Sequence, residues 1–404
     1  MRTLFLLIAA AIFVPGMALA DVDVTPYGFV LANASYNTRT RTDVPVIAAP
    51  DGAGEPNFLI TPRQTRLGLK LKSDASYAPL AIVEIDFWGL RGSGANGGPT
   101  QAAPRLRRAF AELHFSSFDL LAGQEWIVLA PLNPTSLMHV ALPGMMSSGN
   151  LWARLPQVRG TLKAASNEKS EVLLQAALTR PLGADVGMTP VEQGDVLGRG
   201  ELYGWPWVQG RLGYTMKGST SLALGAGVHY GQEDFGNDPA GDDITGSSFA
   251  VAGDVKLAVN KVTISGEAFA GKNIRTLFST AGFAMRPDSI LVDGDYVAYN
   301  EVEGVEVMGG WGELKLAASP KVDLAVSAGM ESVDDEFLAS GDIKSNTTLL
   351  GNVIFKPAKG IQVGVAGGFV NTERIDDDPA TADTKETDDG RKNLNANVSL
   401  MFEF

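Results

Sequence analysis

The 404-residue sequence contains no cysteine, which excludes a disulfide scaffold and all thiol chemistry. Histidine is also scarce, because the chain has only His114, His139 and His229, in separate predicted strands or loops. No His-x-x-x-His, Gly-x-Ser-x-Gly or phosphate-loop pattern occurs. The sequence therefore predicts a protein that is not an enzyme and holds no cofactor, although a fold alone never excludes catalysis.

Beyond its first residues, the sequence lacks any apolar run long enough for a membrane-spanning helix. Arg2 is followed by the short apolar stretch 4–13 and then by Ala18-Leu19-Ala20, a small-residue cleavage site. These features predict that residues 1–20 are a cleaved secretory signal peptide. Residues 21–404 would then be exported as the mature chain.

Basic residues are too few for a protein that binds nucleic acid. The chain has 33 lysines and arginines against 46 aspartates and glutamates, and a net charge of −13. Such a chain lacks the general positive charge that binds phosphate backbones or anionic membranes. Glycine, in contrast, is abundant at 46 residues, and it tolerates the bends of a twisted, closed sheet.

The C-terminal segment reads as a strand with one apolar and one polar face. The apolar face holds Leu394, Ala396, Val398, Leu400, Phe402 and Phe404, and the polar face Asn393, Asn395, Asn397, Ser399 and Glu403. This alternation is typical of a transmembrane β-strand with lipid on one side and water on the other. The alternative is an amphipathic strand of a soluble sandwich. The terminal aromatics Phe402 and Phe404 resemble the signal that the barrel assembly machinery recognises, so we predict that they direct assembly.

Segments with the same alternation recur along the chain at a length of about ten residues. They number about sixteen, and bacterial outer-membrane barrels have an even number of strands. The predicted strands lie near 24–34, 64–74, 79–88, 104–115, 117–126, 155–165, 170–180, 205–216, 219–230, 247–258, 262–271, 305–317, 321–331, 346–356, 361–371 and 392–404.

The connections between these segments alternate strictly between short and long. The short ones carry Asn, Gly, Ser and Pro, as tight turns do, and lie at 73–78, 116, 166–169, 217–218, 259–261, 318–320 and 357–360. The long ones lie near 35–63, 89–103, 127–154, 181–204, 231–246, 272–304, 332–345 and 372–390. Short periplasmic turns and long extracellular loops predict an all-β fold, a transmembrane antiparallel β-barrel of about sixteen strands.

Charged side chains in the early strands alternate with apolar ones. A charge that faced lipid at mid-depth would cost about 2–4 kcal/mol, so the charges should face the lumen. The predicted pore-lining residues are Arg66, Lys70, Lys72, Glu84, Asp86, Arg105, Arg107, Arg108, Glu112, Arg159 and Lys163, with Arg105 and Arg107 near the rim. Arg66, Arg108 and Arg159 should lie at similar depth on neighbouring walls, and rings of such residues favour anions. The alternative is that these charges only pair with one another across strands.

The third long connection is unusually apolar. Between Glu125 and Arg154 it holds no Asp, Glu, Lys or Arg, and an exposed extracellular loop should not be this apolar. We predict that the segment near 127–154 folds into the lumen, like the constriction loop of general porins. The alternative is a contact with a neighbouring subunit. Other loops are acidic, but none has an ordered ligand spacing, so no metal site is predicted.

Five motifs between about residues 60 and 165 resemble the DcaP-like trimeric porins of Gram-negative outer membranes. They are Gln64–Lys70, Ala81–Trp88, Arg105–Phe110, Leu120–Trp126 and Leu155–Arg159. The resemblance implies a sixteen-stranded trimeric porin that passes small anions such as dicarboxylates, with Arg66, Arg108 and Arg159 in the lumen. Members of that family often carry a helical coiled-coil segment before the barrel, whereas strand-like sequence begins here almost at Asp23.

These observations predict an outer-membrane porin for passive diffusion of small hydrophilic solutes, with a preference for anions. Its expected partners are outer-membrane lipid and lipopolysaccharide, small anionic solutes, the barrel assembly machinery and two further copies in a homotrimer, with no nucleic acid. The alternative functions are a non-conducting structural or adhesive barrel and, with less support, a barrel enzyme. Open conductance in planar bilayers separates the first function from the second.

Overall fold

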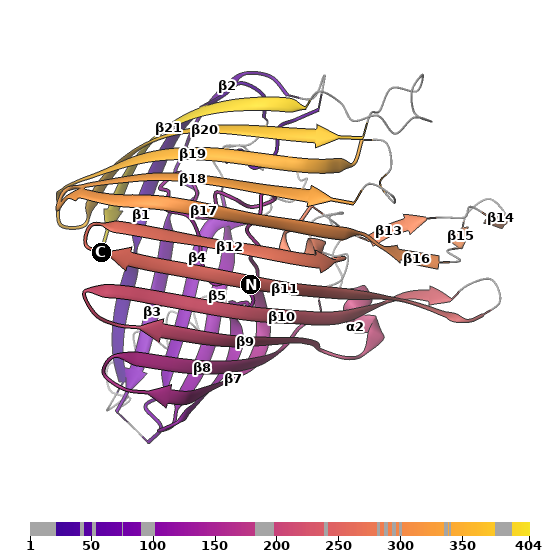
Figure 1. Cartoon of the computed structure of the whole chain (residues 1–404), viewed down its shortest axis with the longest axis horizontal. Helices are drawn as coiled ribbons and strands as arrows, with labels where there is room; N and C mark the ends of the chain where they lie inside the picture. Colours follow the sequence, from indigo (N-terminus) through magenta and orange to yellow (C-terminus); the bar gives the residue numbers. More distant parts are fainter. Residues whose placement is uncertain are drawn as a thin grey trace, which may run out of the picture.

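The computed structural model describes most of the chain after the predicted signal peptide, which itself lies outside the described residues. The described residues are 22–40, 44–50, 54–74, 76–89, 102–181, 198–237, 241–280, 283–286, 290–292, 296–298, 301–334, 338, 341–375 and 390–404. Over these ranges the chain forms a closed barrel of sixteen antiparallel wall strands, and in Figure 1 the strands β7–β12 and β17–β20 of the near wall lie across the view. The predicted fold class is therefore confirmed.

The wall strands pair with one another in chain order. They are β1 (Val22–Asn37), β3 (Arg66–Ser73), β4 (Leu80–Gly89), β5 (Ala103–His114), β6 (Phe118–Trp126), β7 (Arg154–Ser166), β8 (Ser170–Thr179), β9 (Trp207–Met216), β10 (Thr220–Asn237), β11 (Asp243–Val259), β12 (Val262–Lys272), β17 (Glu306–Ser319), β18 (Val322–Val333), β19 (Ile343–Ala358), β20 (Ile361–Arg374) and β21 (Arg391–Glu403). A short strand, β2 (Asn57–Thr61), continues the line of β3 beside β1. The strand β2 pairs with residues 33–37 of β1, and β3 pairs with residues 22–29. Pairing of β1 with β21 closes the barrel.

The closing strand β21 shows why the alternating pattern specifies this wall. Its apolar side chains point away from the barrel, and Leu394 and Phe402 are 55% and 53% exposed. The intervening Asn393, Asn397 and Ser399 are buried on the inner face. A strand with this pattern places its apolar face toward lipid and its polar face toward the interior only in one register.

Short turns join the strands at one end of the barrel, and the long connections leave the other end, on the right in Figure 1. The long connections hold small elements that the sequence pattern did not predict. These are α2 (Arg199–Tyr203), the 3-10 turn η2 (Arg275–Leu277), and the paired strands β13 (Phe283–Arg286) with β16 (Glu301–Gly304) and β14 (Ile290–Val292) with β15 (Tyr296–Ala298). In the part of the chain that the structure describes, no helix is both long and apolar enough to cross a membrane.

The segment 127–153, which joins β6 to β7, packs against the inner faces of strands from several sides of the barrel. Ile127 and Leu129 contact residues of β9, β11 and β12, whereas Met138 and Met145 contact β17, β19 and β20. Leu137 packs between β1, β19 and β21. Much of the apolar core of this barrel is therefore formed by this connection and the inward side chains that surround it.

Candidate pore constriction

A cavity of about 340 Å³ lies between the wall strands β5–β9 and the start of the segment 127–153. Three arginines, Arg108, Arg159 and Arg211, project into it from β5, β7 and β9, and Gln175 projects from β8. The other lining residues are Glu125, Trp126, Ile127, Val128, Pro131 and Asn133. A positive wall thus faces a connection that carries no formal charge.

The three arginines differ in how their charge is compensated. Arg108 donates to both carboxylate oxygens of Glu125, with Nε–Oε1 at 2.8 Å. Arg211 forms a two-point pair with Asp254, at 2.6 and 2.9 Å. Among the described residues, no carboxylate lies within ion-pair distance of Arg159, and its buried Nε makes no hydrogen bond. Arg159 is therefore the arginine of this cavity that has no paired carboxylate among the described residues.

A second charged cluster lies on β4 and β5 and is fully paired. Glu84 and Asp86 face inward, and Arg107 bridges them with two bonds of 2.8 Å. Arg105 binds Asp86 from the other side, with Nη2–Oδ2 at 2.6 Å. Arg107, which we expected near the rim together with Arg105, is only 1% exposed. A register shift between β4 and β5 leaves Arg107 without a pairing partner, and such a bulge turns Arg107 and Arg108 to the same face.

Arg66 belongs to this second cluster and not to the cavity wall. Its Nη2 donates to the carbonyl oxygen of Val140 at 2.8 Å, and its Nε lies 3.7 Å from Glu84. That Arg66, Arg108 and Arg159 lie at similar depth stays a prediction. Arg108 and Arg159 share one cavity, whereas Arg66 holds the segment 127–153 against the wall.

The remaining predicted pore residues lie closer to the short turns. Lys70 and Lys72 share the inward positions of β3 with Arg66. Lys163 is 2.8 Å from Asp119, and Glu112 lies beside His114.

Buried polar side chains hold the segment 127–153 in place from opposite walls. Gln64 accepts hydrogen bonds from the backbone of Val140 and Ala141, at 3.0 and 2.9 Å. Across the barrel, Glu267 accepts from the Leu132 N–H at 2.7 Å, and Glu313 accepts from Thr135 through both N–H and hydroxyl. Because buried backbone groups need such partners, these contacts fix the position of the segment that bounds the cavity.

A second connection also packs into the top of the barrel, which the sequence did not predict. In the residues after β12, Ile274 and Leu277 are fully buried against Leu151 and Ala153. The ring of Phe278 stacks on Trp152 with centroids 4.1 Å apart. The apolar pair Leu277-Phe278 could have indicated this burial, although the connection near 272–304 was predicted to be an extracellular loop.

The structure also adds Arg211, Gln175 and Asp254 to the site, and none of them was predicted. The signal was available, since Arg211 precedes Leu212 in β9 and Leu212 points outward at 50% exposure. The alternation argument that was applied to the early strands therefore applies to β9 and β11 as well.

Comparison with solved structures shows which known fold this barrel shares. The outer membrane channel DcaP of Acinetobacter baumannii superposes with a TM-score of 0.67 at 18% identity, over 96% of this chain and 99% of that chain. This chain has the DcaP fold. An anion-selective porin from Comamonas acidovorans gives a TM-score of 0.55 at 12% identity, over 95% and 100% of the two chains. OprB of Pseudomonas putida gives 0.55 at 11% identity, over 95% and 94%.

At these identities the likeness concerns the fold, and in the fold it confirms the resemblance to DcaP that the early motifs carried. Sequence comparison adds nothing to this, because no protein-family model and no curated protein matches the chain.

Proposed function

We propose that this protein is a porin of the bacterial outer membrane, through which small hydrophilic solutes diffuse passively with a preference for anions. The observation that carries the proposal is the cavity beside the segment 127–153, which three arginines and a single carboxylate line. Charges at the narrowest part of a pore set its selectivity, and the total charge of the protein does not. The acidic net charge of −13 is therefore compatible with an anion-preferring pore.

The chemistry of the wall also suggests a class of solute. Arginine binds carboxylates through two parallel N–H groups, and Arg159 has no carboxylate of its own among the described residues. Arg108 and Arg211 line the same cavity. We infer that small anions with two carboxylates, such as dicarboxylates, are favoured, because one end can bind Arg159 while the other contacts a neighbouring arginine.

The test is the reversal potential of the protein in a planar bilayer under a salt gradient. We expect open channels and a potential of the sign that anion permeation produces. Arg159→Ser should move the potential toward cation preference, because it removes the arginine of the cavity that has no paired carboxylate. Arg180→Ser is the matched control, since Arg180 pairs with Glu201 in the long connection outside the cavity, and it should change the potential little.

Two results would contradict the proposal. A wild-type protein that gives no conductance would be a structural or adhesive barrel, and a cation-selective wild-type pore would show that another section sets selectivity.

We further propose export through a cleaved signal peptide, insertion by the barrel assembly machinery beside lipopolysaccharide, and assembly as a homotrimer. The trimer is supported by the resemblance to DcaP-like porins and by OmpT of Vibrio cholerae, whose trimer form has a TM-score of 0.54 at 12% identity. After mild extraction, a gel run without boiling should show a band well above the monomer that collapses on heating. A monomeric band under the same conditions would contradict the trimer.

A further inference from the structure

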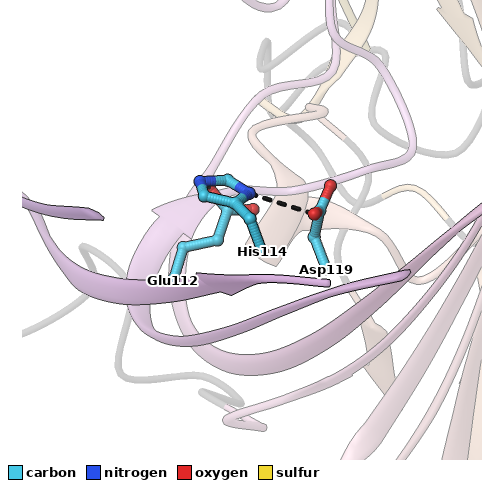
Figure 2. A group of neighbouring side chains, drawn as sticks. All are labelled: Glu112, His114 and Asp119. Atoms are coloured by element: carbon cyan, nitrogen blue, oxygen red, sulfur yellow. Dashed lines mark hydrogen bonds and ion pairs between the residues drawn. The ribbon is translucent and has the colours of Figure 1, made fainter. Parts of the chain in front are cut away.

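Three side chains with metal-binding groups converge at the short-turn end of β5 and β6. Glu112 and His114 are two residues apart on β5, so they lie on the same face of the strand. Asp119 of β6 is the direct register partner of His114. Figure 2 shows the three side chains close together, with the His114 ring facing Asp119. They lie on the inner face, because the intervening Leu113 is exposed on the outer face.

The distances between these groups suit a shared ion. His114 Nδ1 lies 3.0 Å from Asp119 Oδ1, and His114 Nε2 lies 3.9 Å from Glu112 Oε2. One ligand atom from each residue lies within 4.8 Å of the other two. Ligands of a tetrahedral zinc ion lie about 3.3 Å apart, given metal–ligand distances of about 2.0–2.2 Å. Small side-chain rotations are therefore enough to bring all three groups onto one ion.

The backbone that carries these residues is held rigidly. The Phe115 N–H donates to the Phe118 carbonyl at 2.8 Å and closes the turn, and the His114 N–H donates to the Tyr77 carbonyl at 2.7 Å. The ring of Phe115 packs between Tyr77 and Phe118. Ligands on a rigid hairpin lose little conformational entropy when an ion binds.

We propose that Glu112, His114 and Asp119 form a binding site for a divalent transition-metal ion of the zinc class, on the inner face near the short turns. One imidazole and two carboxylates are ligands that such ions accept, and water completes the coordination. All three side chains are partly exposed, at 35% for His114 and less for the two acids, so an ion can reach them from the lumen.

Lys163 of β7 is the competing cation at this site. Its Nζ lies 2.8 Å from Asp119 Oδ1, the oxygen that also faces His114. A bound ion competes with this ammonium group, because both are cations attracted to the same carboxylate and they repel each other. A divalent ion also changes the local charge, because the formal charges of the two acids and the lysine sum to −1 and the ion raises this sum to +1.

The test is a calorimetric titration of the purified full-length protein in detergent with Zn²⁺. We expect one Zn²⁺ per chain, and we expect His114→Ala to weaken binding by more than about tenfold, because even second-shell losses cost about that much. Lys163→Met should strengthen binding, because it removes the competing ammonium group. A variant that failed to fold would not bind Zn²⁺ more tightly, so stronger binding by Lys163→Met shows that changes at this site act on the ion and not on folding.

Asp323→Asn is the matched control. Asp323 is an inner-face carboxylate near another short turn and binds Lys315 and Lys356 without an imidazole nearby, so the change should leave Zn²⁺ affinity unaltered. The proposal is overturned if the wild type binds no Zn²⁺, if His114→Ala binds it equally well, or if Ca²⁺ displaces it at equal concentration. The last result would indicate binding to acidic oxygens alone. The titration requires no transport, so its outcome is independent of the proposed function.

Discussion

Arg108 and Arg159 line the same cavity but contribute differently to its electric field. Arg108 is bound to Glu125 by three hydrogen bonds, the shortest of 2.5 Å, so the pair presents little net charge to a solute. Arg159 has no such partner among the described residues. Removing the charge of Glu125 and removing the charge of Arg159 should therefore shift the reversal potential in opposite directions.

Glu125→Gln tests this difference. The change keeps the size of the side chain but removes its charge, so the positive charge of Arg108 becomes available to solutes. We expect the reversal potential to move further toward anion preference, opposite to the effect of Arg159→Ser. Glu201→Gln, which removes the partner of Arg180 outside the cavity, should leave the potential unchanged. A shift of Glu125→Gln toward cations would show that the cavity is not the selective section.

His139 predicts a pH dependence for the segment that bounds the cavity. Its side chain is buried in the segment 127–153, and burial lowers the pKa of His139 from 6.5 to about 4. The buried form therefore stays neutral while an exposed form would take up a proton below about pH 6.5. The packed position is fully stable above this pH and loses stability as the pH falls from 6.5 to 4, by up to about 3 kcal/mol at roughly 1.4 kcal/mol per pH unit.

We expect single-channel conductance to rise or become noisier as the pH is lowered through this window. His139→Leu should remove the part of the change that lies between pH 6.5 and 4, because it leaves no group to protonate at this buried position. Equal pH profiles for wild type and variant would show that His139 does not control the packing.

The segment 127–153 shows what sequence could and could not predict for a single element. Its lack of charge predicted burial, because nothing in it favours water. The wall residues that hold it were out of reach, since Glu267 and Glu313 lie 135 and 178 positions away from their partners Leu132 and Thr135. Alternation places both acids on the inner face but says nothing of what each one binds. The bulge at Arg107 was missed for a related reason, because one unpaired residue reverses the alternation only locally.

The variant Glu267→Ala/Glu313→Ala should release this segment from its wall. The Leu132 and Thr135 N–H groups would lose their side-chain acceptors, and each unsatisfied buried group costs about 1–3 kcal/mol. We expect a larger conductance and weaker anion preference, because the segment no longer confines solutes against the arginines. Asp323→Asn removes an inner-face acid that contacts no residue of this segment among the described hydrogen bonds, and it should preserve both properties. Unchanged conductance in the double variant would mean that the remaining contacts, including those of Gln64 and Arg66, position the segment without the two acids.

At the scale of the whole barrel, the sequence predicted more than it did for the site. All sixteen predicted strands correspond to wall strands, because alternation and turn residues are local signals that every strand repeats. The closure of β1 on β21 followed from the even number of strands. The shape of the pore did not follow, because it depends on connections such as residues 273–280, whose packing inside the barrel is decided by contacts with Trp152 and Glu331.

At the seam between β1 and β21, Phe404 could have two roles. Its backbone could help to close the barrel, and its ring could act as the assembly signal. Phe404 pairs with Gly28 through two backbone hydrogen bonds of 3.2 and 3.1 Å, while its ring is exposed on the outer face. Deleting Phe404 removes both bonds and the ring, whereas Phe404→Ala removes only the ring. Two backbone bonds contribute about 0.5–1.5 kcal/mol each, a small part of the stability of a closed barrel.

If the ring is an assembly signal, both variants should accumulate in the periplasm and give less folded barrel in the outer membrane. Once folded from denaturant in detergent, each should still show wild-type conductance, because the ring lies far from the cavity wall in sequence and points outward. Phe369→Ala, which changes a partly buried phenylalanine of the neighbouring strand β20, controls for the loss of an aromatic ring as such and should insert normally. If Phe404→Ala inserts normally but the deletion does not, Phe404 acts by closing the seam and not through its ring. Only the deletion loses the hydrogen bonds to Gly28.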